Sequence, residues 1–111
     1  MNNVSLIGSL VRDPDVTVER NGRQVCSMQV EVPRRSLDGN REPGVIYVDV
    51  VAFGKQAVAC GEELAEGDRI GISGTLERDD SLDGRGPRRS RWEVHAHQVD
   101  LLGARDGAGS S

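Results

Sequence analysis

The 111-residue chain lacks long hydrophobic runs, and this excludes a membrane helix. No apolar run approaches the roughly 20 residues that such a helix needs. Met1 is followed by the polar Asn2 and Asn3 instead of a basic and then apolar leader segment. We therefore expect a cytoplasmic protein that does not associate with membranes.

Motifs of metal, disulfide and catalytic sites are also absent. Cys26 and Cys60 lie far apart without a CxxC spacing, so the sequence indicates two reduced, buried thiols and neither a disulfide framework nor a zinc ribbon. No GxSxG, P-loop, HExxH or GxGxxG motif occurs. His95 and His97 lie two apart on one expected strand, with no nucleophile nearby in the sequence. We predict a protein that is not an enzyme and binds no cofactor or metal.

The charge of the chain is acidic in sum but basic in two stretches. Asp and Glu number 18 against 14 Lys and Arg, a net charge of -4 that argues mildly against a nucleic-acid surface. Arginines gather in residues 34–41 and again in residues 85–91, whereas acids crowd residues 62–68. Solvated loop arginines and a ligand-binding surface are two competing interpretations of the basic stretches.

Alternating apolar and polar residues predict five strands. We expect them over residues 4–18 with a bend at Asp13-Pro14, and over residues 26–32, 45–53, 70–76 and 92–102. Asn21-Gly22 is a strong hairpin signal between the first two strands. Trp92 shares its strand parity with the apolar Val94 and Ala96, which favours a packed position for it.

The segments between the strands predict one helix and two long loops. Residues 55–65 have a short helical pattern that Glu66-Gly67 ends. Residues 33–44 and 79–90 are rich in glycine and proline and are expected to be exposed loops. Residues 103–111 are small and polar, so we expect a disordered end after a single domain over residues 1–102.

Five strands with a helix between the third and fourth fit an all-β protein, the five-stranded Greek-key barrel of the OB-fold. The pattern alone leaves a split antiparallel sheet open. In such a barrel the loops after strands 1 and 4, together with the third strand, border the ligand face. Tyr47, Asp49, Val51 and Phe53 lie on one face of the third strand, mixing two aromatics with a carboxylate.

Four segments of this chain resemble the bacterial single-stranded-DNA-binding protein family. They are MNNVSLIGSL at residues 1–10, RDP at 12–14, VPRR at 32–35 and VDVVAFGKQA at 48–57. The similarity covers roughly residues 1–102. It implies an OB barrel, a homotetramer built as a dimer of dimers, and sequence-tolerant binding and protection of single-stranded DNA in replication, recombination or repair. It also implies a cytoplasmic, nucleoid-associated location.

The resemblance supplies candidate DNA-binding residues. Tyr47 and Phe53 match the family's base-stacking aromatics, while Arg34, Arg35 and Lys55 match its phosphate-facing cations. The alternative is that both aromatics are packed strand residues. With four further arginines from the two basic stretches, the candidate site comprises Arg34, Arg35, Arg41, Tyr47, Phe53, Lys55, Arg85, Arg88 and Arg89.

Two departures from the family pattern predict a weaker binder without a recruiting tail. Ser36 and Ser81 stand where the family commonly has aromatics, and each lost platform is worth about 1–3 kcal/mol. Residues 103–111 have neither an acidic cluster nor a terminal Phe, so we expect no recruitment of replication or repair proteins through them. The chain is either shortened or a tail-less paralogue, and the sequence does not choose between the two.

The main competing interpretation is a protein adaptor. An OB-fold subunit similar to primosomal replication proteins would contact other proteins and bind nucleic acid only weakly. The missing aromatics and the acidic net charge favour it, whereas Tyr47, Phe53 and the two basic stretches favour DNA binding. The first strand, apolar on one face, is also a candidate for edge-to-edge pairing with a second copy.

Overall fold

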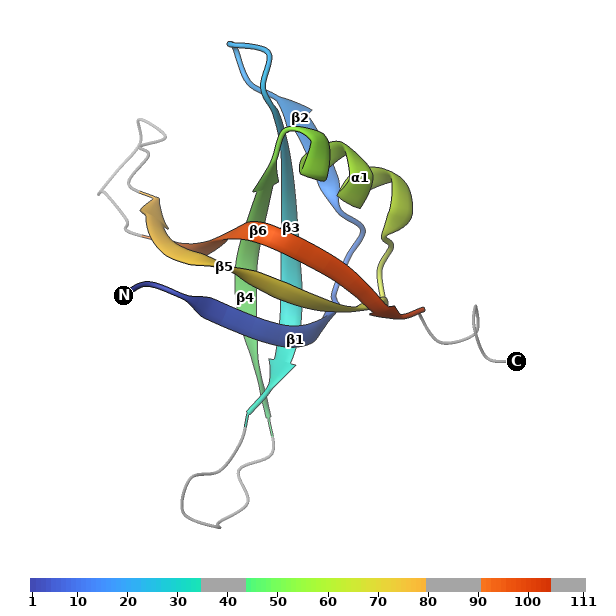
Figure 1. The fold of residues 1–111 in the computed structure, drawn as a ribbon. Coiled ribbons are helices and arrows are strands. Elements are labelled where there is room, and N and C mark those ends of the chain that lie inside the picture. The colour runs from blue at the N-terminus through green and yellow to red at the C-terminus, as the bar shows by residue number, and fades with distance from the viewer. Residues whose placement is uncertain (35–43, 80–90, 105–111) are drawn as a thin grey trace, which may run out of the picture.

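The computed structural model describes residues 1–34, 44–79 and 91–104 (Figure 1). Within these residues, strands and one helix follow one another along the chain as β1 Val4–Leu10, β2 Asp15–Val18, β3 Gln24–Pro33, β4 Val45–Phe53, α1 Lys55–Glu63, β5 Arg69–Asp79 and β6 Arg91–Gly103. The expected helix and four of the five expected strands are present, and the expected first strand is divided into β1 and β2. The arginines 35, 41, 85, 88 and 89 of the candidate site, and residues 105–111 of the expected disordered end, lie outside the described residues.

Five of the strands form a closed barrel. The order of pairing is β1-β5-β6-β4-β3, and β1 closes the ring by pairing Ser9 and Leu10 with Glu31 and Val30 of β3. Only β4 and β6 run parallel; the other pairs are antiparallel. In Figure 1, β1, β5 and β6 cross in front of β3 and β4. This architecture confirms the prediction of an all-β OB-fold with one short helix.

β2 lies outside the barrel and extends β3 as a hairpin. The expected single bent strand is two strands: β1 ends at Leu10, and β2 begins at Asp15 and pairs with β3. The predicted Asn-Gly turn joins β2 to β3, with Gly22 at a φ of 88°. Glu19 N donates to the carbonyl of Arg23 at 2.8 Å, which closes the turn. The hairpin reaches past the barrel at the top of Figure 1.

The core lies inside the barrel and under α1. Met28, Val30, Val50, Ile70 and Val94 are fully buried there and come from four different strands. The helix packs against β3, β4 and β2 and begins directly after β4. Its last residue is Glu63, two residues before the expected end, because Leu64 adopts an extended backbone.

The two cysteines belong to this core. Cys26 on β3 and Cys60 on α1 are both buried, free thiols, as predicted. The hydrogen bond between the two thiols and the burial of Cys60 raise the pKa of Cys60 well above its ordinary value. Cys60 is therefore a neutral packing residue at neutral pH, where a thiolate nucleophile would need a lowered pKa.

Both long hairpins continue beyond the strand ends that the sequence predicts. Pro33 still pairs with Val45, and Asp79 still pairs with Arg91. These extensions project past the barrel, so a residue on the inward-facing side has no core to pack against there. Trp92 is such a residue: it is 57% exposed, and the prediction of a packed position for it is wrong.

Candidate nucleic-acid interface

The outer face of β4 carries the aromatic side chains that the sequence singles out. Tyr47, Asp49, Val51 and Phe53 alternate with Val50 and Ala52, which point into the core. Tyr47 is 60% exposed, whereas Phe53 is half-buried. Phe53 follows Tyr47 by six positions, which corresponds to about 20 Å along an extended strand. The strand therefore presents two aromatic groups on one face, spaced for separate contacts with an extended ligand.

Charged and aromatic side chains surround Phe53. The guanidinium carbon of Arg23 lies 4.3 Å from the centroid of the Phe53 ring. On β6, the His95 ring meets Phe53 at 5.1 Å between centroids in an edge-to-face arrangement at 71°. The register explains the contact with His95, because Val51 of β4 pairs with His95 and its side chain shares the outer face. Phe53 is thus flanked by a cation and by an imidazole.

Each of these flanking groups has a carboxylate partner. Arg23 Nε lies 2.7 Å from Glu19 Oε1, and His95 Nε2 lies 2.8 Å from Glu93 Oε1. The hydrogen bond from Arg23 lowers the pKa of Glu19 below its ordinary value, and the same bond raises the pKa of Arg23. Glu19 is therefore ionised at neutral pH and neutralises much of the charge that Arg23 brings to Phe53.

Two of the predicted cations lie beyond the two ends of β4. Lys55 follows Phe53 by two residues at the start of α1 and is exposed. Arg34 is exposed beside the opposite end of β4, where its backbone N–H donates to Gly44 O at 3.0 Å. The structure therefore places Tyr47 and Phe53 on one face of β4, with Arg34 beyond one end of the strand and Lys55 beyond the other.

Carboxylates also lie on this face. Glu31 pairs in register with Tyr47, and Asp49 accepts a hydrogen bond from Gln29 at 3.2 Å. Glu93 lies on the same side through its contact with His95. Of these acids the sequence pattern indicated only Asp49, which is on β4 itself. Alternation along one strand does not tell which residues of the neighbouring strands lie beside it. These carboxylates oppose a polyanion electrostatically.

Sequence reasoning missed two residues at this face, Arg23 and His95, and the exposure of Trp92 on β6. Arg23 is brought to Phe53 by the hairpin turn and by the pairing of Val25 with Phe53. His95 reaches Phe53 through the parallel pairing of β4 and β6. Trp92 is an exposed aromatic with the Arg78 guanidinium 5.9 Å from its ring. For Arg23, the Asn-Gly turn was a local signal, because a tight hairpin places the residues on its two sides next to each other.

The described part of the chain shows neither a metal-binding cluster nor a helix suited to a membrane. No group of three or more His, Cys, Asp or Glu side chains there is arranged to hold a metal ion. No helix among residues 1–34, 44–79 and 91–104 is long and apolar enough to cross a membrane.

The fold and this face together define a small OB barrel that presents two aromatic side chains on the outer face of β4, with a cation beyond each end of that strand. The chain belongs to the Single-strand binding protein family, whose model matches residues 1–102.

Relatives with this domain occur in distant bacteria. The chain is 34% identical over 106 residues to Single-stranded DNA-binding protein 1 of Synechocystis sp., an alignment that covers 95% of this chain and 86% of the relative. It is 36% identical over 104 residues to the Single-stranded DNA-binding protein of Clostridium tetani, covering 92% and 70%. The corresponding protein of Treponema pallidum is 30% identical over 105 residues, covering 94% of this chain but 59% of the relative. The adaptor interpretation gains no support from these names.

Proposed function

We propose that this protein binds single-stranded DNA without strong sequence preference, through the outer face of β4. The observation that carries the proposal is the pair of aromatics Tyr47 and Phe53 on the outer face of β4, in a barrel from this family. Arg34 and Lys55 lie beyond the two ends of that strand. Bases stack on aromatic rings whatever their sequence, because every base has a π-face. The cations supply contacts to the backbone phosphates. Single-stranded DNA exposed during replication, recombination or repair is the expected substrate.

The two aromatics have different roles in this mechanism. Tyr47 is largely exposed, so a base can stack on its ring without displacing a neighbour. Phe53 is flanked by Arg23 and His95, so a base that stacks there must share the ring with one of them or displace it. Each stacked base contributes about 1–3 kcal/mol.

The electrostatic contribution of the face is small for a DNA-binding surface. Carboxylates of Glu31, Asp49 and Glu93 lie among the aromatics. We expect this acidity, together with Ser36 and Ser81 in place of aromatics, to make the affinity of a single barrel modest. Arg35 stays in the proposed site on the family resemblance, and Arg41, Arg85, Arg88 and Arg89 stay in it because they lie in the two basic stretches of the sequence.

Assembly into a homotetramer, a dimer of dimers, is part of the proposal because it multiplies weak contacts. In the described residues, β1 pairs with β5 over Val4–Ser9 but with β3 only at Ser9 and Leu10, so much of one β1 edge has no strand beside it. An unpaired strand edge is a template for pairing with a second copy.

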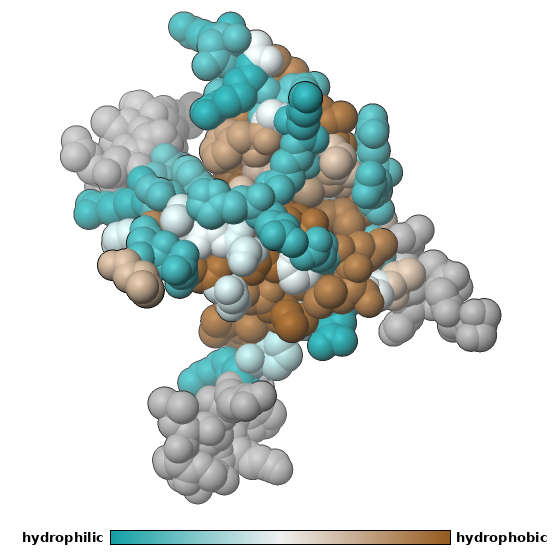
Figure 2. Space-filling model, viewed as in Figure 1, coloured by the Kyte–Doolittle hydropathy of each residue, from teal (hydrophilic) through white to brown (hydrophobic). Residues whose placement is uncertain are grey.

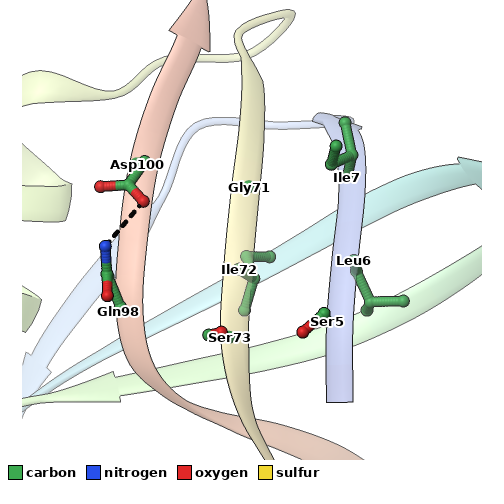
Figure 3. Close-up of a pocket in the computed structure, with 8 residues that line it drawn as sticks. All are labelled: Ser5, Leu6, Ile7, Gly71, Ile72, Ser73, Gln98 and Asp100. Carbon is green, nitrogen blue, oxygen red and sulfur yellow. Dashed lines mark hydrogen bonds between the residues drawn. The ribbon is translucent and has the colours of Figure 1, made fainter.

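A face for packing two such pairs lies on β1, β5 and β6. Figure 2 shows hydrophobic surface gathered over β1 and the end of β6, where Ile7, Leu101 and Leu102 are exposed. An open hollow of about 460 Å³ crosses the three strands, with a hydrogen bond between Gln98 and Asp100 at its edge (Figure 3). Its lining combines the small Ser5, Gly71 and Ser73 with the apolar Leu6, Ile7 and Ile72. An apolar surface with small side chains supports close approach of another sheet.

The proposal is tested by fluorescence-anisotropy titration of a labelled oligo-dT across a salt series, with duplex DNA of equal length as competitor. We expect salt-sensitive binding that the duplex does not displace, because the stacking platforms require unstacked bases. Absence of binding at low salt would overturn the proposal and give Tyr47 and Phe53 a structural role only.

A further inference from the structure

Arg23 occupies a position that the proposed function does not explain. Its guanidinium lies between the Glu19 carboxylate, at 2.7 Å, and the ring of Phe53, 4.3 Å from the centroid. The side chains of Arg23 and Glu19 are both substantially exposed, at 50% and 40%. A solvent-exposed cation therefore covers part of a proposed base platform while an acid neutralises it.

The backbone sets this arrangement. Glu19 and Arg23 bracket the turn between β2 and β3, and Glu19 N donates to Arg23 O at 2.8 Å. On the other side of the turn, Arg23 N donates to Asn21 Oδ1 at 2.8 Å. Gly54 N donates to Gln24 O at 2.8 Å and so fixes the start of β3 against the end of β4, beside Phe53. Arg23 is thus held next to Phe53 by main-chain contacts, while its side chain contacts the Glu19 carboxylate and the Phe53 ring.

An ion pair of this kind is easily exchanged. Exposed pairs gain little because water screens both charges and two long side chains lose rotamer freedom. A DNA phosphate is an equally good partner for a guanidinium, since both anions accept hydrogen bonds from its planar fork. A base that takes the covered face of Phe53 must move Arg23, and its own phosphate arrives close to the displaced guanidinium.

We propose that Arg23 is a DNA-contact residue whose guanidinium pairs with Glu19 in the free protein. When a base stacks on Phe53, the guanidinium leaves the Glu19 carboxylate and binds a backbone phosphate instead. This inference rests on the proposed function, because it requires DNA at Phe53. The inference adds Arg23, next to the β2–β3 turn, to the DNA contacts. It also makes Glu19 a competitor of the phosphate for the Arg23 guanidinium, which lowers the affinity of the protein for DNA.

A double-mutant cycle tests the exchange, with oligo-dT affinity and its salt dependence as readouts. Glu19→Gln should strengthen binding roughly two- to fivefold at low salt, since an exposed ion pair of ordinary strength no longer competes. It should also steepen the slope of log affinity against log salt by up to about 0.7, the value for one phosphate contact on a single strand. Arg23→Gln should weaken binding, and Glu19→Gln should give no gain in that background.

The matched control is Glu62→Gln, which removes one exposed carboxylate from α1. An equal gain from Glu62→Gln, or a gain from Glu19→Gln that persists with Gln at position 23, would mean that Glu19 acts only through overall charge and would overturn the inference. If the unaltered protein binds oligo-dT while the cycle shows no coupling, only the inference fails. If the unaltered protein does not bind, the proposed function fails and the inference with it.

Discussion

At the scale of single residues, the position of a side chain along its strand decides how available it is. Tyr47 and Phe53 have the same parity on β4, yet Tyr47 is 60% exposed and Phe53 is half-buried. The reason is the neighbours, because Arg23 and His95 contact Phe53. Parity predicts the face on which a residue lies, whereas its exposure depends on what the adjoining strands place next to it.

Truncating either aromatic should weaken DNA binding without unfolding the protein. We expect Tyr47→Ala and Phe53→Ala each to cost about 1–3 kcal/mol of oligo-dT binding, the usual value of one stacked base. Anisotropy titration measures the loss. Ile46→Ala is the control, because Ile46 is 47% exposed on the same strand with the opposite parity. A folded Tyr47→Ala/Phe53→Ala protein that binds as tightly as the unaltered one would contradict the stacking mechanism.

At the scale of elements, the pairing of β5 with β6 positions His95, the β6 residue that contacts Phe53. The register shifts between Ser73 and Gly74, so β6 has an extra residue at this point. A Cβ at Gly74 would collide with the backbone carbonyl of His95. The extra residue is His97. The close approach at Gly74 requires glycine, and it involves the carbonyl of the residue whose ring contacts Phe53.

Gly74→Ala should destabilise the fold by about 1–3 kcal/mol, because backbone atoms must shift to make room for the methyl group. Urea denaturation would measure the change as a lower midpoint at a fixed protein concentration. Gly71→Ala on the same strand is the control, since its Cβ would meet only the flexible end of Leu102 at 3.3 Å. Equal midpoints for the two variants would show that the close approach at His95 has no energetic consequence.

At the scale of the whole molecule, the barrel leaves one strand edge and one sheet face available for assembly. β1 has no pairing partner among the described residues along most of its second edge, and Ile7 is half exposed on the adjoining face. Linking several modest sites would raise the overall affinity for a long strand without any new contact.

Ile7→Glu should break the proposed assembly, because a carboxylate buried between two sheets is costly without a partner. We expect sedimentation to give an oligomer for the unaltered protein and a smaller species for the variant. The variant should still bind a short oligo-dT, since Ile7 is on β1 and the proposed site is on β4. A monomeric unaltered protein would contradict the assembly proposal and leave the DNA-binding proposal untouched.

The sequence by itself determined the strands, the Asn-Gly hairpin, the helix and the family. Each depends on neighbours within a few residues: the period of two in β4, the turn at Asn21-Gly22, the ordered motif of residues 48–57. These local signals were also sufficient to place Tyr47 and Phe53 on one face.

Only the tertiary structure decided which residues meet. Arg23 and His95 lie at Phe53 because β3 and β6 both pair with β4 in a particular register, and Trp92 is exposed because its hairpin runs past the end of the barrel. The same registers bring Glu31 beside Tyr47. Side-chain alternation is a property of one strand, but register is set by long-range pairing and core packing, so the sequence pattern of a single chain does not reveal it.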